Sequence, residues 1–333
     1  MSSSTPDPTV GKQPRLPALR RVAPDSLPPL RLGRRDIDIV RAVWEYRALT
    51  THQVEKLFFR PNTRDAPRAG EAVPRRKINS RCQRRLQLLF QHGYLLRDEQ
   101  PVKRSEGRKP LVYFLDRRGS ELLAGHGEHV DWAAGESDVQ SPFLEHLLAT
   151  NDVRIAVTLA SEQQGYTLAK WLDDKTLKSR HVKQYVRIEA DNGKSIRAAI
   201  VPDGYFRLSL PQGDAHYLLE LDRGTVVGRS SHWERRDWRR KVLAYTEYIH
   251  SGMFEDRYNG RGARILTVVP SEARLRHLRD ITEDAGGRRR FWFALADEVT
   301  AEAVLTEPIW RIASASGVHR LLRRVALSSD GEN

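Results

Sequence analysis

The sequence has 333 residues, 39% hydrophobic and 30% charged, a composition typical of a soluble globular protein with room for two domains. No apolar run reaches the roughly 18–20 residues that a membrane-spanning helix needs, and residues 1–30 lack the apolar core of a signal peptide, so we expect a cytoplasmic protein. The single cysteine, Cys82, excludes intramolecular disulfides and cysteine-based zinc sites.

The positive charge is concentrated in the first third of the chain. Residues 31–120 hold 22 Lys and Arg against 10 Asp and Glu, and this excess accounts for most of the net charge of +13. A basic module beside a balanced remainder predicts a polyanionic partner. The alternative is a solvated basic face without a partner. An anionic membrane is a weaker candidate, because no basic amphipathic helix with exposed Trp or Phe stands out.

Composition divides the chain into two domains. Residues 1–30 contain seven prolines and few apolar side chains, so we expect a disordered tail. Residues 125–140 are polar and contain glycines, as linkers do. The predicted domains are therefore residues 31–124 and 141–330.

The first domain opens with three predicted helices. Ile37, Val40, Val43 and Trp44 recur at helical spacing and predict the first helix. Thr50 and Gln53 form a capping-box pattern that predicts the start of the second. A third helix is expected over residues 75–91, after a loop at 60–74 that is rich in Pro and Gly, and it ends before Gly93.

A predicted hairpin follows the third helix. Its arms are residues 94–97 and 111–115, and its tip, residues 103–110, is basic. Three helices followed by a hairpin are typical of a winged helix-turn-helix, in which the third helix enters the major groove and the wing contacts the DNA backbone. The alternative is a winged helix that contacts other proteins. The predicted DNA-binding residues are Arg76, Ser80, Gln83, Arg84 and Gln87 on the helix and Lys103, Arg104, Arg108 and Lys109 in the wing.

The second domain is predicted to be mixed α/β. A helical stretch over residues 143–159, with a break near Asn151, comes first. The expected elements after it are strands at 166–172, 196–201 and 217–222, a helix at 232–250, a strand at 265–269, a helix at 271–284 and a strand at 291–294.

Three acidic residues stand out in this domain. Glu220 and Asp222 lie two apart in a predicted strand and therefore point to the same face. Asp203 begins the preceding strand and can converge on them. Carboxylates in an apolar strand need a metal ion or a basic partner, and three oxygen ligands suit Mg²⁺ or Mn²⁺. The alternative is a rim of exposed carboxylates held by arginines such as Arg223 or Arg197.

Several segments together resemble the replication-relaxation family, whose proteins occur on bacterial plasmids and integrative elements. The resemblance covers most of residues 31–270. It implies a winged helix joined to a domain similar to the PD-(D/E)xK nuclease fold, with Asp203 and Glu220 as the metal-binding acids. The segments that carry it are Leu32–Asp36, Leu49–Thr50, Arg84–Leu86, Pro202–Phe206, Leu219–Thr225 and Arg240–Tyr245.

The sequence departs from the nuclease pattern at one position. Active enzymes of this fold usually carry a lysine two residues after the second acid, where this chain has Asp222. Lys241, on the following predicted helix, is the candidate replacement, and its alternative is a solvated surface lysine. The candidate catalytic residues are therefore Asp203, Glu220 and Lys241, and the candidate metal ligands are Asp203 and Glu220, which the resemblance implies, together with Asp222, which the strand spacing adds.

Three functions remain open. The chain lacks the His-x-His pattern of one class of nicking relaxase and the P-loop of nucleotide-driven motors. The first function is a duplex-DNA-binding protein for replication, relaxation or mobilisation of a mobile element, the second a metal-dependent endonuclease or nickase, and the third a winged-helix transcription regulator. Expected partners are double-stranded DNA, with replication or mobilisation proteins and a second copy of the chain as further candidates, and no membrane.

Overall fold

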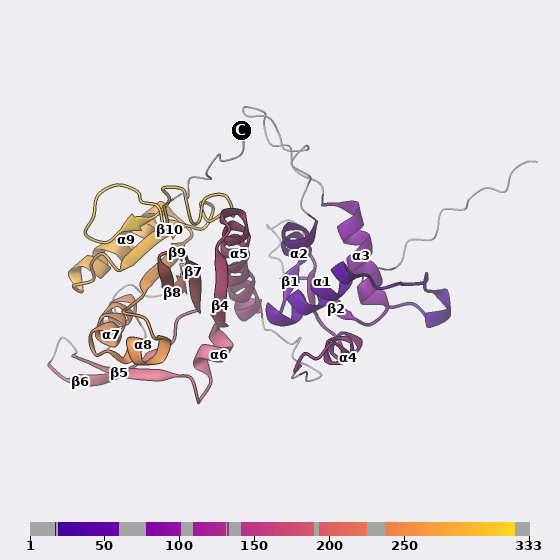
Figure 1. The fold of residues 1–333 in the computed structure, drawn as a ribbon, viewed down its shortest axis with the longest axis horizontal. Coiled ribbons are helices and arrows are strands. Elements are labelled where there is room, and N and C mark those ends of the chain that lie inside the picture. The colour runs from indigo at the N-terminus through magenta and orange to yellow at the C-terminus, as the bar shows by residue number, and fades with distance from the viewer. Residues whose placement is uncertain are drawn as a thin grey trace, which may run out of the picture. The chain divides into compact units, whose positions relative to one another are not determined.

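The computed structural model describes residues 17, 19–59, 78–100, 109–130, 132, 141–189, 193–224 and 237–323. The chain divides into two compact units, Met1–Ser141 and Pro142–Asn333 (Figure 1). Among the helices that the structure describes, none is long and apolar enough to cross a bilayer.

The first unit contains a small sheet and four helices over its described residues. The strands pair in the order β1-β3-β2, and both pairings are antiparallel. This is the winged-helix order expected from the sequence, with α4 following the hairpin. The elements are α1 (Arg34–Glu45), β1 (Leu49–Thr50), α2 (Thr51–Phe58), α3 (Ser80–Gln91), β2 (Leu95–Asp98), β3 (Val112–Leu115) and α4 (Arg117–Gly125).

Side-chain caps fix where these helices begin. The capping box predicted at α2 is present, since Thr50 Oγ1 accepts from the Gln53 amide at 3.2 Å and Gln53 Oε1 accepts from the Thr50 amide at 2.9 Å. Asn79 caps α3 by accepting from the amides of Arg81 and Cys82. The third helix therefore begins at residue 80, later than the predicted 75. Residues 75–77, which include Arg76, lie outside the described residues.

A buried ion pair joins α1 to α3. Asp36 is only 3% exposed and accepts from the Arg85 guanidinium, which also donates to the Arg31 carbonyl at 2.7 Å. The side chain of Arg84 is exposed. Adjacent arginines on α3 thus have different environments: Arg85 joins two helices of the core, whereas Arg84 faces solvent.

Arg20–Val22 and Pro28, predicted to be part of a disordered tail, are hydrogen-bonded to residues at the end of α3. The segment includes a short 3₁₀ helix, η1 (Pro24–Ser26). Arg21 donates to the carbonyls of Phe90 and Leu95 and to the Asp116 carboxylate. The prediction is therefore wrong for this stretch, because hydrogen bonds to carbonyls at the end of α3, rather than apolar burial, hold it.

The second unit is built on a six-stranded sheet in the order β11-β10-β9-β8-β7-β4. Strands β4, β7 and β8 are antiparallel neighbours, and β8, β9 and β10 are parallel. The elements are α5 (Ser141–Gln164), β4 (Thr167–Asp173), α6 (Asp174–Lys178), β5 (Gln184–Glu189), β6 (Ser195–Ile200), β7 (Gly204–Leu210), β8 (Gly213–Leu221), α7 (Trp238–His250), α8 (Met253–Tyr258), β9 (Arg264–Val269), α9 (Glu272–Asp284), β10 (Phe291–Leu295) and β11 (Arg311–Ile312).

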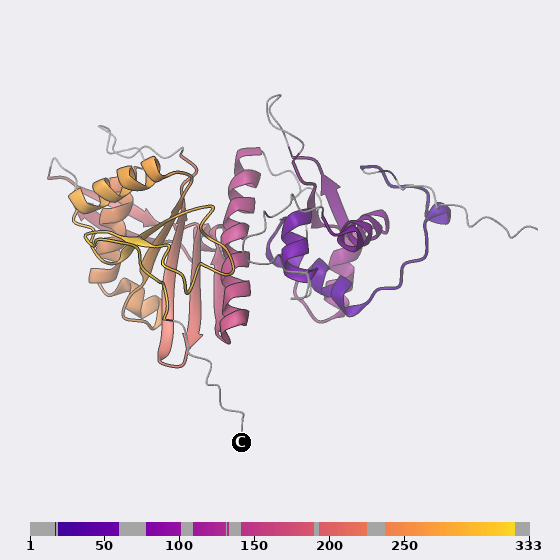
Figure 2. The same cartoon turned by 90° about the horizontal axis from the view of Figure 1, so that it is seen from above.

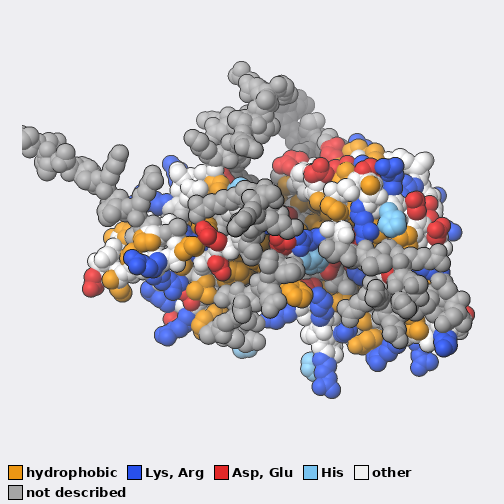
Figure 3. Space-filling view, turned by 180° about the vertical axis from the view of Figure 1, so that it is seen from behind, with side chains coloured by type: hydrophobic (Ala, Val, Ile, Leu, Met, Phe, Trp, Pro, Cys, Tyr) orange, Lys and Arg blue, Asp and Glu red, His pale blue; other side chains and the backbone are white. Residues whose placement is uncertain are grey.

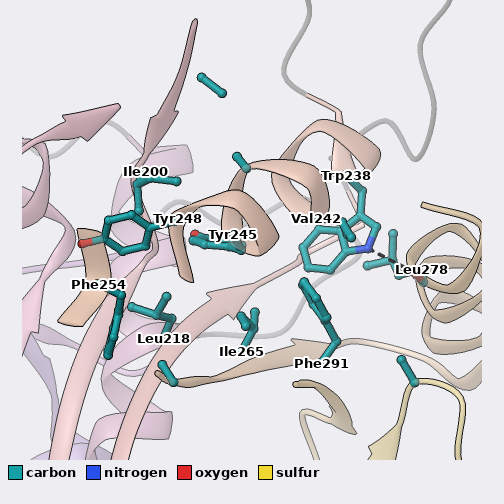
Figure 4. Packing of buried hydrophobic residues seen from close by; sticks show 14 of the residues in the cluster. Ile200, Leu218, Trp238, Val242, Tyr245, Tyr248, Phe254, Ile265, Leu278 and Phe291 are labelled. Carbon is teal, nitrogen blue, oxygen red and sulfur yellow. Dashed lines mark hydrogen bonds between the residues drawn. The ribbon is translucent and has the colours of Figure 1, made fainter. Parts of the chain in front are cut away.

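Helices cover both faces of this sheet. Helix α5 lies on one face, and α7, α8 and α9 lie on the other (Figure 2). Alternation along β8 sends Leu219 and Leu221 to the core under α5 and Leu218 to the core under α7. Figure 4 shows Trp238 and Val242 of α7 in this second core, where the Trp238 indole donates to the Leu278 carbonyl at 3.1 Å. The predicted mixed α/β architecture is confirmed.

Several predicted boundaries change. Helix α5 continues through Asn151, because an Asn costs a helix only a fraction of a kcal/mol and apolar residues on both sides of it are buried. Helix α7 begins at Trp238 after its cap Asp237, and the predicted start at 232 lies outside the described residues. The strand predicted at 196–201 is β6, which pairs with β5 in a separate hairpin rather than in the main sheet.

Candidate functional site

The predicted acidic residues gather where β7 begins and β8 ends. Asp203 directly precedes β7, and its Oδ2 accepts from the Leu221 amide at 2.8 Å. Glu220 is the penultimate residue of β8, and Asp222 follows that strand. Because β7 and β8 are antiparallel neighbours, the start of one lies beside the end of the other. Sheet topology therefore brings together residues that lie 17–19 positions apart.

Lys241 reaches into this cluster. Its Nζ lies 2.5 Å from Glu220 Oε2, and Tyr245, one turn further along α7, donates its hydroxyl to Glu220 Oε1. Glu220 is 2% exposed, and burial raises the pKa of its carboxyl group. Burial alone would lower the pKa of Lys241, but the charges of Glu220 and Asp203 raise it, so this lysine stays protonated.

The first turn of α7 is an unfavourable place for a cation. The amino end of a helix carries partial positive charge, which opposes Lys241 three residues beyond the first residue of the helix. The carboxylates must supply the attraction that holds the ammonium there. Lys241 is therefore the cationic partner of the acidic cluster. The alternative interpretation, a solvated surface lysine, is wrong.

Asp203 has a second cationic partner on the opposite helix layer. His146 of α5 places Nε2 3.0 Å from Asp203 Oδ1. Burial alone would raise the pKa of Asp203, but the bond to His146 and the charge of Lys241 lower it. The hydrogen bond to Asp203 in turn raises the pKa of His146. The His146–Asp203 pair therefore lies on the side of the site that faces α5.

Asp222 is bound by a different cation. Arg274 of α9 donates through Nη2 at 2.6 Å and through Nε at 3.1 Å to Asp222 Oδ2, and the Gly224 amide donates to Oδ1. Asp222 is 4% exposed. Glu220 and Asp222 are thus buried and Asp203 is half-buried, and the three are compensated by Lys241, His146 and Arg274 rather than forming an exposed rim held by Arg223 or Arg197.

The donor set fits a divalent ion poorly in this arrangement. Both oxygens of Glu220 and both of Asp222 already accept hydrogen bonds from the chain's own groups. Over the described ranges, no three His, Cys, Asp or Glu side chains lie close enough to share a metal ion. Mg²⁺ and Mn²⁺ need several oxygens at once. The predicted ligands Asp203, Glu220 and Asp222 therefore do not meet as a ready metal site.

The predicted DNA-binding residues fall into three groups. Ser80, Gln83 and Arg84 are exposed on α3. Gln87 is half-buried, and its amide donates to the Pro17 carbonyl at 2.9 Å. Lys109 is half-buried at the start of the returning wing arm. Arg76, Lys103, Arg104 and Arg108 lie outside the described residues.

Three site residues were missed by the sequence analysis. His146 and Arg274 lie on flanking helices, 57 and 52 positions along the chain from their partners Asp203 and Asp222. Neither belongs to a motif, so no local signal identifies them. Tyr245 ends the Arg240–Tyr245 segment that carries the family resemblance, but its hydroxyl bond to Glu220 follows from the three-dimensional fold alone.

Comparison with known proteins decides the family. The replication-relaxation profile matches residues 40–263, about two thirds of the chain. This chain belongs to the replication-relaxation family. The order seen here, three helices and a hairpin followed by a mixed α/β unit, agrees with the order of elements expected from the sequence.

Other comparisons add little to this assignment. No curated protein matches the chain significantly. A solved structure of the restriction endonuclease FokI aligns with 10% identity and a TM-score of 0.23, covering 80% of this chain and 42% of FokI. The fold of this replication-relaxation protein is therefore described from its own strand order and connections.

Breaking the Glu220–Lys241 pair should strongly destabilise the second unit. Lys241→Met leaves a buried carboxylate without its cation, so we expect a loss of roughly 2–4 kcal/mol, slightly below the range for fully enclosed pairs because Lys241 is 30% exposed. Urea unfolding measures it. The double variant Glu220→Gln/Lys241→Met removes both charges and should recover much of the loss. Equal losses in the single and double variants would contradict the pairing.

The His146–Asp203 pair should make stability depend on pH. Folding raises the pKa of His146 above its ordinary value of 6.5, so the protonated imidazole stabilises the folded protein. This stabilisation is fully present below pH 6.5, and it is lost as the pH rises through the pKa that His146 has in the folded protein. Asp203 stays ionised across this range, because its pKa is lowered. The difference in melting temperature between wild type and His146→Gln should be largest near about pH 5.5 and shrink toward about pH 9. A difference that does not change with pH would contradict this assignment.

Proposed function

We propose that this replication-relaxation protein binds duplex DNA through α3 of its first unit and acts in replication, relaxation or mobilisation of a plasmid or integrative element without cutting the DNA itself. The observation that carries the proposal is that α3 has a buried apolar face and an exposed polar face. Cys82, Leu86 and Leu89 are buried, whereas Ser80, Gln83 and Arg84 are exposed.

The exposed side chains of α3 are suited to reading base edges. Positions 80, 83 and 84 are three and four residues apart and so form one stripe on the helix. Arg binds guanine bidentately, Gln binds adenine, and Ser accepts or donates. Arg81, which is also exposed, adds a cation beside this stripe. Any surface helix exposes polar residues, so the proposal combines these side chains with the basic charge of residues 31–120.

The N-terminal segment that contains Pro17 and Arg20 covers part of α3, so fewer residues of this helix remain available to contact DNA bases. Gln87 and Gln91 donate to the Pro17 carbonyl, and Gln91 also donates to the Arg20 carbonyl. The later turns of α3 are therefore covered by the chain's own residues. We assign DNA contact to the first half of the helix and leave Gln87 out of the base-reading set.

A non-cleaving role is supported by the charge arrangement of the second unit. Cleavage of a phosphodiester needs groups that polarise the phosphate and position water. Here Glu220 and Asp222 are occupied by Lys241, Tyr245 and Arg274. The unit is suited to a scaffold role in which its acids contribute to folding rather than to chemistry.

The base-reading role of α3 is tested by Arg84→Ala. With a DNA site selected from random sequences, the variant should lose about 1–3 kcal/mol of discrimination between that site and random duplex. Arg117→Ala is the matched control, since Arg117 is an exposed arginine on α4 of the same unit. Thermal melting should be unchanged in both variants. If Arg84→Ala and Arg117→Ala behave alike in anisotropy titrations, α3 is not the reading helix.

A metal-dependent nickase is the second candidate function. The observation that favours it is Lys241, which contacts Glu220 beside Asp203, as a displaced catalytic lysine would. Supercoiled plasmid incubated with the full chain and Mg²⁺ or Mn²⁺ decides between the two. The proposed function predicts no nicking above that of Glu220→Gln. Nicking that is abolished by Glu220→Gln and by Lys241→Met would establish the second candidate instead.

A further inference from the structure

The β5–β6 hairpin of the second unit has one apolar and one basic face. Strand alternation turns Val186, Ile188, Ala198 and Ile200 inward to the core under α7. The opposite face, which we call the ribbon face, consists of Tyr185, Arg187, Glu189, Ser195, Arg197 and Ala199. Arg187 and Arg197 are exposed on it.

The two arginines of the ribbon face are direct cross-strand partners. The register pairs Arg187 with Arg197, and like charges placed opposite each other destabilise an antiparallel pair. Among the ion pairs of the described residues, none involves either arginine. An anion between the two guanidinium groups would remove this repulsion.

Tyr185 holds one of these guanidinium groups in place. The Arg197 guanidinium lies 3.7 Å from the centre of the Tyr185 ring, and Lys183 Nζ lies 5.4 Å from it. Stacking restricts the long arginine side chain and so lowers the entropy lost on binding. Because a cation covers the ring, this tyrosine serves to position Arg197 and is poorly placed to stack a base.

The chain segment that contains the ribbon face is basic. Residues 174–200 hold seven Lys and Arg against three Asp and Glu, although residues 121–333 as a whole are nearly balanced. In Figure 3, Lys and Arg side chains follow the lower edge of the second unit, which β5, β6 and the preceding loop occupy in Figure 1. The ribbon face is therefore a local basic surface, separate from that of the first unit.

The ribbon is also fastened to the helix of the acidic site. The Arg240 guanidinium donates to the Arg197 carbonyl at 2.7 Å, and the next residue of α7, Lys241, binds Glu220. The backbone of Arg197 is thus held by the hydrogen bond from Arg240, and its side chain is held by stacking on the Tyr185 ring. A surface arranged in this way offers one positioned guanidinium group, that of Arg197, and one exposed guanidinium group opposite it, that of Arg187, to one ligand.

We propose that the ribbon face is a second DNA-binding surface, on which Arg187 and Arg197 grip the phosphate backbone of duplex DNA. Guanidinium groups bind phosphate oxygens bidentately, and paired groups suit consecutive phosphates. A single strand would need open aromatic faces for its bases, which the covered Tyr185 does not offer. The proposal rests on the proposed function, since it extends DNA binding from the first unit to the second.

The test uses the full chain and a duplex of about 40 base pairs, titrated by anisotropy at several salt concentrations. Arg187→Glu/Arg197→Glu should bind roughly tenfold or more weakly than wild type, and the slope of log K against log salt should fall by about two, since each lost phosphate contact removes about 0.9. Arg276→Glu/Arg289→Glu makes the same charge change at exposed sites at α9 and before β10, and should bind nearly as wild type does. Arg187→Gln/Arg197→Gln repeats the test without adding negative charge.

The outcomes separate the two proposals. If both ribbon variants match the Arg276/Arg289 control while Arg84→Ala still loses discrimination, the ribbon proposal is overturned and the function of α3 stands. If the ribbon variants bind weakly and Arg84→Ala has no effect, the ribbon proposal stands and the reading role of α3 falls. Protection of Tyr185 from hydroxyl-radical oxidation by duplex should accompany binding. Protection by single-stranded DNA but not by duplex would overturn duplex as the ligand.

Discussion

A carboxylate buried at the end of the central strand is the constraint on which the second unit depends. Glu220 has almost no exposure to water, so its charge must be balanced by protein groups. Lys241 supplies that charge from the first turn of α7, against the helix dipole, and Tyr245 supplies the remaining hydrogen bond. Asp203 and Asp222 are balanced in the same way from α5 and α9. Three helices are thereby fixed to one end of the sheet by charge as well as by apolar packing.

Local patterns predicted the fold and the acidic half of the site. Apolar periodicity and the Thr50–Gln53 capping box located the helices of the first unit, and alternation located β8 and β9. The spacing of Glu220 and Asp222 placed both on one face. The cations were harder to predict, because His146 and Arg274 are ordinary helix residues whose partners are set by how distant elements pack.

In the first unit, too, contacts between residues that are distant in the sequence were not predicted. Proline content predicted a disordered segment over residues 1–30, yet Arg20, Arg21 and Val22 are hydrogen-bonded to the end of α3. Hydropathy counts apolar side chains, whereas this segment is held by Arg21 and by glutamines that donate to its carbonyls. The same contacts removed Gln87 from the predicted reading surface. Arg84 and Arg85 are adjacent in sequence, and only the buried Asp36 distinguishes their roles.

The buried acids of β8 also matter to the chain before it folds. Residues 217–221 form an apolar stretch of high β propensity, of the kind that promotes aggregation when exposed. In the unfolded chain Glu220 and Asp222 are hydrated and charged, and they oppose pairing of this stretch with copies of itself. Lys241 is synthesised 21 residues after Glu220, and Arg274 52 residues after Asp222, so neutralisation follows synthesis of the helices that cover the strand. Side chains that are costly to bury in the native unit thus act as gatekeepers that keep its central strand soluble until those helices arrive.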